Sequence, residues 1–126
     1  MKKILIVIAD YYEDISLSLL KNAKNNLSNF SLKIINVPGV FEIPVTISKN
    51  IKKYDGFIAL GCVIKGETPH FDFISSASTQ AIMNLSVISK KPIGNGIITC
   101  LNMRQANARG KKGKEAAKAV ISVLDQ

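Results

Sequence analysis

The only histidine of the chain lies in a segment whose side chains could bind an anion and transfer a proton. The segment, KGETPHFDF, spans residues 65–73, and His70 follows a glycine, a threonine and a proline. Imidazole exchanges protons readily near neutral pH. Free backbone N–H groups at residues 66–68, before a helix, would suit a phosphate, with the side chain of Glu67 turned away. The segment predicts a proton-transfer site beside a bound anion, although an ordinary capped helix start would have the same local pattern.

A second group of residues would suit a flat polar ligand. The segment VPGVFEIP, residues 37–44, places Phe41 beside Glu42, so that a ring could stack and a carboxylate could accept hydrogen bonds. Tyr11 and Tyr12 offer another aromatic surface. Cys62 lies inside the apolar run ALGCVI, and such a buried setting does not favour a nucleophilic thiolate.

The elements that must position these residues alternate between two periodicities. Apolar runs at residues 2–9, 31–37, 55–64 and 92–100 predict strands, and the first and third of these are typical of strands buried on both faces. Amphipathic stretches predict helices at residues 11–30, 41–54, 68–89, 102–109 and 112–124. In the third helix we expect Thr68 at the N-cap and Pro69 at the first helical position.

The order of these elements predicts one α/β domain over residues 1–126, with a parallel sheet and helices on both faces. Ligands of such folds bind beyond the carboxyl ends of the strands. Four segments should therefore meet at one rim, namely residues 10–12, 37–42, 64–70 and 100–102.

The composition argues against several other classes of protein. The net charge of +8 comes mainly from scattered lysines, aromatic residues make up 6%, and no nucleic-acid-binding motif is visible. The longest apolar run is too short to cross a membrane, and no cluster of ligands predicts a metal site. Cys62 and Cys100 are expected to be buried free thiols in a cytoplasmic protein.

Three stretches together resemble lumazine synthase, the penultimate enzyme of riboflavin biosynthesis. They are VPGVFEIP, ALGCVIKGETPHFDF, and GNGIITCLNMRQANAR with the following KKGKEAA, and they cover nearly the whole chain in the family's order. The resemblance implies a flavodoxin-like three-layer α/β/α sandwich with a four-stranded parallel sheet. It also implies a transferase that condenses 5-amino-6-(D-ribitylamino)uracil with 3,4-dihydroxy-2-butanone 4-phosphate to 6,7-dimethyl-8-ribityllumazine, without metal or cofactor. The implied assembly is a homopentamer whose sites lie between neighbouring subunits.

The same resemblance implies a role for individual residues. It assigns proton transfer to His70. It assigns binding of the ribitylaminouracil to Tyr11, Val40, Phe41, Glu42, Cys62, Val63, Ile64 and Asn95. It assigns binding of the butanone phosphate to Gly66, Glu67, Thr68, Arg109 and Lys112. Of these, Asn95, Arg109 and Lys112 would reach the site from the neighbouring subunit. Many family members have an aromatic residue at the position of Asn95.

Three other classes of function stay open at this point. A flavodoxin-like module that only binds a flavin or nucleotide would share the fold and the anion turn but would not need His70. A basic nucleic-acid-binding protein would bind with a steep dependence on salt. A shell-forming scaffold that has lost catalysis would retain only the ability of its subunits to assemble.

Overall fold

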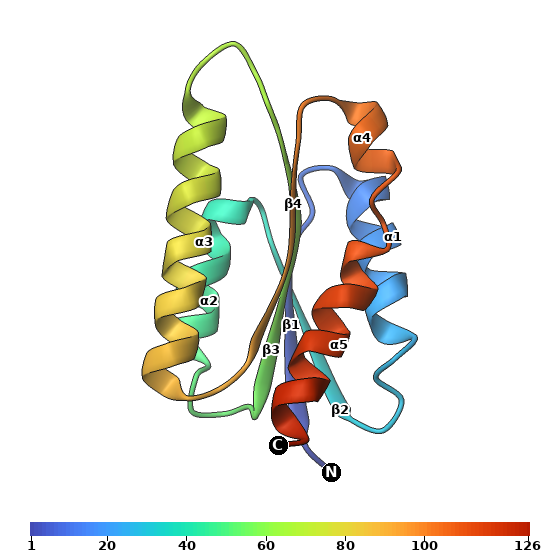
Figure 1. Ribbon diagram of the computed structural model, residues 1–126, viewed down its shortest axis with the longest axis vertical. Coiled ribbons are helices and arrows are strands. Elements are labelled where there is room, and N and C mark those ends of the chain that lie inside the picture. Colours follow the sequence, from blue (N-terminus) through green and yellow to red (C-terminus); the bar gives the residue numbers. More distant parts are fainter.

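The computed structural model describes residues 1–126, which form a four-stranded sheet covered by helices on both faces (Figure 1). The strands are β1 (Lys3–Ala9), β2 (Ser31–Val37), β3 (Gly56–Ile64) and β4 (Ile93–Cys100). The helices are α1 (Glu13–Lys24), the 3₁₀ turn η1 (Val40–Glu42), α2 (Ile43–Lys49), α3 (His70–Ser89), α4 (Met103–Asn107) and α5 (Lys112–Leu124). The predicted α/β class and the four predicted strands are confirmed.

The sheet is parallel throughout and has the strand order β2-β1-β3-β4. The chain passes from β1 to one neighbour, β2, and then crosses to the other side of β1 to form β3. The order therefore reverses between β1 and β3. In open α/β sheets the crevice beyond such a reversal point is the usual position of a ligand.

Alternate side chains of β1 enter two separate cores, one on each face of the sheet. The even-numbered residues from Ile4 to Ile8 pack with buried side chains of α1 and α5. The odd-numbered residues from Leu5 to Ala9 pack with those of α2 and α3. Figure 1 shows the same division, with α2 and α3 on one face and α1, α4 and α5 on the other. Burial on both faces explains why the sequence of this strand is continuously apolar.

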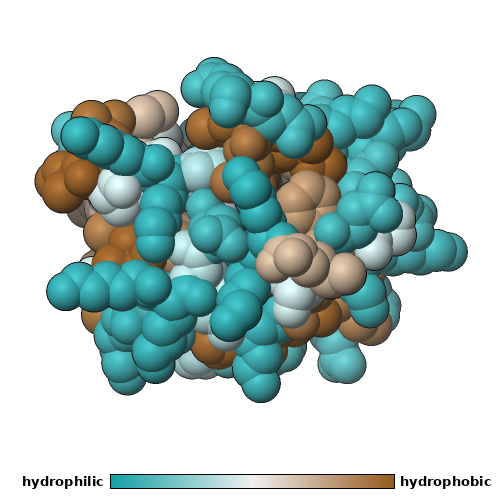
Figure 2. All heavy atoms as spheres, turned by 90° about the horizontal axis from the view of Figure 1, so that it is seen from below, coloured by the Kyte–Doolittle hydropathy of each residue, from teal (hydrophilic) through white to brown (hydrophobic).

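The two ends of the sheet differ in character. The carboxyl ends of the strands meet at the upper edge in Figure 1, where α1 and α3 begin. Three lysine pairs lie at the opposite end, at or just before the starts of β1, β3 and β4; they are Lys2–Lys3, Lys52–Lys53 and Lys90–Lys91. Figure 2 views that end from below and shows mainly hydrophilic side chains. Part of the positive charge therefore lies far from the edge at which a ligand is expected. No helix combines the length and the apolar character that a membrane crossing requires.

Four predicted helices are shorter than their sequence patterns indicated, and one of them, α4, covers only Met103–Asn107 of the stretch 102–109. Helix α1 occupies only Glu13–Lys24 of the stretch 11–30. Helix α2 ends at Lys49 because the side-chain amide of Asn50 donates to the carbonyl of Thr46 at 2.8 Å, and the chain continues in tight turns. Helix α3 begins at His70, with Pro69 rather than Thr68 at the N-cap. The reason is that the carbonyl of Pro69 accepts the first helical hydrogen bonds, from Asp72 N–H at 3.1 Å and Phe73 N–H at 3.2 Å.

Candidate active site

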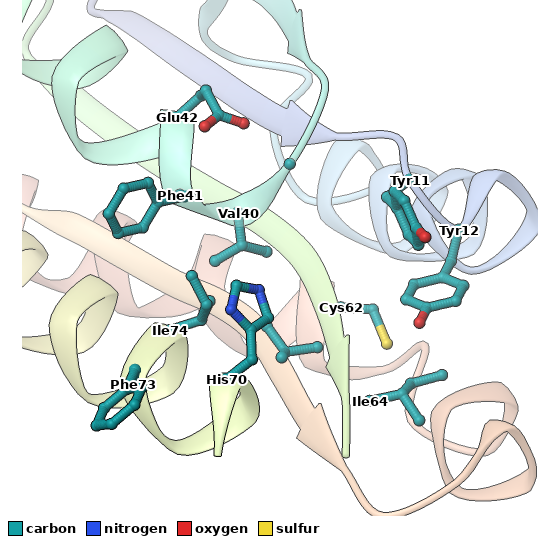
Figure 3. A pocket seen from close by; sticks show the side chains of 12 residues that line it. Tyr11, Tyr12, Val40, Phe41, Glu42, Cys62, Ile64, His70, Phe73 and Ile74 are labelled. Atoms are coloured by element: carbon teal, nitrogen blue, oxygen red, sulfur yellow. The ribbon is translucent and has the colours of Figure 1, made fainter. Parts of the chain in front are cut away.

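A cavity of about 670 Å³ opens at the carboxyl edge of the sheet, at the reversal point between β1 and β3 (Figure 3). We call it the rim cavity. Three of the four segments expected at the rim contribute to it: those after β1, after β2 and after β3. The lining residues are Tyr11, Tyr12, Gly39, Val40, Phe41, Glu42, Cys62, Val63, Ile64, His70, Phe73 and Ile74.

The fourth expected segment, residues 100–102, starts at the same edge of the sheet, where Cys100 lies opposite Ile64, but it does not line this cavity. The chain turns away from the rim after Cys100 to begin α4. There the carboxamide oxygen of Asn102 accepts a hydrogen bond from the backbone N–H of Gln105 at 2.9 Å and caps the helix. The carbonyl of Cys100 still contacts the rim, since it accepts the N–H of Lys65 at 2.9 Å.

Two neighbouring tyrosines form one side of the rim cavity. The ring centroids of Tyr11 and Tyr12 lie 4.9 Å apart and the rings are nearly perpendicular, at 83°. Tyr11 is 75% exposed, whereas Tyr12 is half-buried and packs against the core that includes Cys62. Burial raises the pKa of the Tyr12 phenol, and the neighbouring Tyr11 adds to the shift. Tyr12 therefore stays a neutral phenol over the physiological range of pH.

The thiol of Cys62 forms part of the floor of the cavity and is only 6% exposed. Burial raises its pKa to about 12, and the adjacent thiol of Cys100 contributes to the shift. A thiol of this kind stays protonated and is a poor nucleophile. Both cysteines are free and buried, as predicted, and Cys62 offers the ligand an apolar surface rather than a reactive group.

The cavity also receives the first turn of α3. His70 is exposed, and its ring points into the cavity toward Val40 (Figure 3). Phe73 and Ile74 follow on the same side of the helix because residues three and four positions apart share a face. The imidazole thus lies among apolar side chains, within one cavity with Phe41 and Glu42 of η1.

The predicted anion turn, residues 66–68, lies between the end of β3 and His70. Its residues are exposed, and the backbone N–H groups of Gly66, Glu67 and Thr68 donate to no acceptor within the protein. Apart from Gly66 and its two chain neighbours, no protein atom lies within 4 Å of the position that a Cβ would take at Gly66. The hydroxyl of Thr68 accepts the N–H of His70 at 3.4 Å and so joins the turn to the helix. The turn therefore presents unpaired donors next to the histidine, which is the arrangement that an anion requires.

The remaining predicted site residues lie in a second cavity of about 620 Å³, which shares no residue with the rim cavity. We call it the edge cavity, because it includes residues of β4, the last strand of the sheet. It is lined by Thr79, Asn95, Ile97, Ile98, Thr99, Ala108, Arg109, Lys111, Lys112 and Glu115. The three residues that the family resemblance assigned to a neighbouring subunit are all among them.

The edge cavity is rich in positive charge. Arg109 is exposed, and the only hydrogen bond of its side chain to the protein runs from Nη1 to the carbonyl of Thr99, at a long 3.5 Å. Lys112 forms an exposed ion pair with Glu115, with 3.4 Å between Nζ and Oε2. The carboxamide oxygen of Asn95 accepts the N–H of Ile97 at 3.0 Å. The guanidinium is therefore available to bind an anion from outside the subunit.

Sequence reasoning did not assign some of these lining residues to the site. Gly39, Phe73 and Ile74 complete the rim cavity, and Lys111 and Thr79 belong to the edge cavity. The spacing of Phe73 and Ile74 from His70, three and four residues along a predicted helix, is a signal that could have identified them.

Comparison with known proteins gives the family of this chain. The family model for 6,7-dimethyl-8-ribityllumazine synthase matches residues 1–126. The chain belongs to this family. Lumazine synthases similar to it include that of Bartonella tribocorum, 44% identical over 96% of this chain and 87% of the relative. The enzyme of Agrobacterium fabrum is 42% identical over 97% of this chain and 92% of the relative. The enzyme of Afipia carboxidovorans is 40% identical over 97% of this chain and 83% of the relative. The expectations of an enzyme and of this family are confirmed.

Proposed function

We propose that this protein condenses 5-amino-6-(D-ribitylamino)uracil with 3,4-dihydroxy-2-butanone 4-phosphate to give 6,7-dimethyl-8-ribityllumazine, phosphate and two molecules of water. Membership of the lumazine synthase family supports the reaction. The observation that carries the assignment to particular residues is the rim cavity, in which an exposed tyrosine, Glu42 and His70 surround one space. The anion turn, residues 66–68, lies beside it.

In the arrangement that we propose, each substrate has its own part of the site. The ribitylaminouracil lies in the rim cavity, with its flat ring on Tyr11 and its polar groups near Phe41 and Glu42. The backbone of Val63 and Ile64, at the end of β3, contacts the ring, and Val40 and Cys62 provide apolar surface. The butanone phosphate binds to the free N–H groups of residues 66–68, which are suited to a phosphate.

The chemistry requires several proton transfers but no redox step. The primary amine of the uracil attacks the ketone and loses water to form a Schiff base. Elimination of phosphate leaves an enol that tautomerises to a carbonyl. The ribitylamino nitrogen attacks this carbonyl, and loss of a second water closes the ring. His70 would take up and return protons during these steps, and a general base of this kind contributes a factor of about 10²–10⁴. Holding the two substrates in contact supplies the rest of the acceleration.

We further propose that a complete site needs two subunits, in a homopentamer. The rim cavity contains no arginine or lysine, whereas the edge cavity contains Arg109, Lys111 and Lys112. A dianionic phosphate on the anion turn would gain most from such cations through charge-assisted hydrogen bonds. If the edge cavity of one subunit faces the anion turn of the next, the contact is head-to-tail, and a rotation of one fifth of a turn per subunit closes it into a five-membered ring. Asn95 would then approach the aminouracil from the neighbour.

Two smaller proposals complete this description. Residues 1–126 act as one domain, since both cores share the same sheet. The cytoplasm suits the protein because the neighbouring thiols of Cys62 and Cys100 are both free, and thiols stay reduced in that compartment.

The direct test is to mix the purified protein with both substrates and to follow the fluorescence of the lumazine together with the release of phosphate. The proposal predicts that both products appear at equal rates and only when both substrates are present. Binding of a flavin or lumazine without any condensation would contradict it and would favour a ligand-binding module.

A further inference from the structure

Tyr11 is an unusual residue for a stacking platform because little of the protein holds its ring. It follows β1 directly and is 75% exposed. The only aromatic ring in contact with it is that of Tyr12. Exposed side chains change rotamer on the picosecond to nanosecond scale, and a ligand that immobilises such a side chain loses part of its binding free energy to the ordering. A ring that is already fixed when the ligand arrives avoids this loss.

Tyr12, in contrast, is held from two sides. Its ring packs against the core formed by the sheet, α1 and α5. Its carbonyl accepts the N–H of Ser16 at 2.9 Å in the first turn of α1. The hydroxyl of Ser16 donates in turn to the carbonyl of Ala9 at 2.5 Å, so the end of β1 and the start of α1 are joined. The backbone N–H of Asp10 donates to the carbonyl of Val37 at 3.1 Å and so ties the segment before Tyr11 to the end of β2.

The two rings are in contact at a centroid distance of 4.9 Å and an angle of 83°. This perpendicular arrangement is one that aromatic pairs prefer, because the positive edge of one ring meets the negative face of the other. Both tyrosines line the same side of the rim cavity, next to Cys62 and Ile64 (Figure 3). A fixed Tyr12 therefore restricts the plane in which the ring of Tyr11 lies.

We propose that Tyr12 is a positioning residue for the aminouracil substrate: it holds the ring of Tyr11 perpendicular to its own, so that Tyr11 offers a preformed stacking surface. This inference rests on the proposed function. Tyr12 acts through its ring and not through its hydroxyl, and its effect is confined to the heterocyclic substrate. The butanone phosphate, which has no ring to stack, is bound independently of it.

The test compares variants that keep or remove the ring. Tyr12→Phe keeps it, and both Michaelis constants should stay within about twofold of wild type. Tyr12→Leu removes it, and should raise the KM for the aminouracil and the Kd of the lumazine product about two- to tenfold. The KM for the butanone phosphate should not change. Tyr12→Met, which also lacks the ring, replaces Tyr12→Leu if circular dichroism shows that the leucine variant is misfolded.

A matched control and a double mutant make the assignment specific. Tyr54→Leu removes one ring of another nearly perpendicular pair, with Phe57, at a position outside both cavities. It should leave the Michaelis constants unchanged. In a Tyr11→Leu background, Tyr12→Leu should have no further effect on aminouracil binding, because residues that act through one contact are not additive.

Three results would overturn the proposal. An equal loss in Tyr12→Phe and Tyr12→Leu would mean that the hydroxyl contacts the substrate directly. Additive effects of the Tyr11 and Tyr12 substitutions would mean that Tyr12 acts without Tyr11. Wild-type constants in Tyr12→Leu would mean that the ring has no role. A wild-type protein that forms no lumazine would instead contradict the proposed function, which separates the two failures.

Discussion

Replacing Arg109 by alanine should weaken the binding of the butanone phosphate and leave binding of the aminouracil nearly unchanged. The guanidinium is exposed and makes a single long hydrogen bond to the protein, so its removal should change the free energy of unfolding by no more than about 0.5 kcal/mol. A charge-assisted contact to a phosphate contributes about 1.5–3 kcal/mol. This corresponds to an increase of about 10- to 150-fold in the dissociation constant of the phosphate substrate.

Each substrate can be titrated separately by calorimetry, and steady-state rates can be measured with one substrate varied at saturation of the other. Arg109→Lys should give an intermediate loss because it keeps the charge but not the planar pair of donors. Lys111→Ala is the matched control, since it removes one positive charge from the same cavity. The Lys111→Ala substitution should raise the dissociation constant of the butanone phosphate only a few-fold if Arg109 makes a specific contact. Equal losses in the two alanine variants, or a selective loss of aminouracil affinity, would contradict a specific contact between Arg109 and the phosphate.

Three further substitutions test other parts of the structure. His70→Asn should reduce kcat by about 10²–10⁴ with an unchanged melting temperature, and an unaltered kcat would make the imidazole a bystander. Burial raises the pKa of Cys62 from 9.0 to about 12. Between these pH values the folded state keeps a proton that the unfolded chain releases. The contribution of Cys62 to the free energy of unfolding is therefore fully present below pH 9 and is lost as the pH rises toward 12. Urea denaturation of Cys62→Ala should show a decline with pH that is shallower by up to about 1.4 kcal/mol per pH unit. In Gly113→Ala the new Cβ would collide with the backbone carbonyl of Leu19, so α5 must move away from α1. Denaturation should then show a loss of about 1–3 kcal/mol, and an unchanged stability would contradict this packing.

The sequence predicted the strands better than the helix ends. Strands β1 and β3 were identifiable because they are buried on both faces and carry continuous apolar runs. Strand β2 has the predicted bounds, Ser31–Val37, although only Val37 of it is buried. The ends of α2 and α3 depend on local competition for hydrogen bonds, as at Asn50 and Pro69. Propensity alone does not show which of several polar groups will bond to a given carbonyl.

The candidate site was predictable to the extent that it follows from strand order. Residues after β1, β2 and β3 form one cavity because parallel strands end at the same edge. Spacing along the chain could not reveal that Arg109 and Lys112 lie in a separate cavity, because that depends on β4 being an edge strand. The perpendicular contact of Tyr11 and Tyr12 likewise needs the ring positions and not merely two adjacent tyrosines.

In the proposed assembly, one active site combines the rim cavity of one subunit with the edge cavity of its neighbour. The most direct measurement is the activity of assemblies produced by co-expression of equal amounts of His70→Asn and Arg109→Ala chains. In a mixed ring, a site is intact only if His70 comes from one kind of chain and Arg109 from the other. At a butanone phosphate concentration well below the KM of the Arg109→Ala variant, random assembly should therefore restore about one quarter of the wild-type activity, above either variant alone. Activity that never exceeds the mean of the two separate variants would contradict the claim and would place both residues in the site of a single chain.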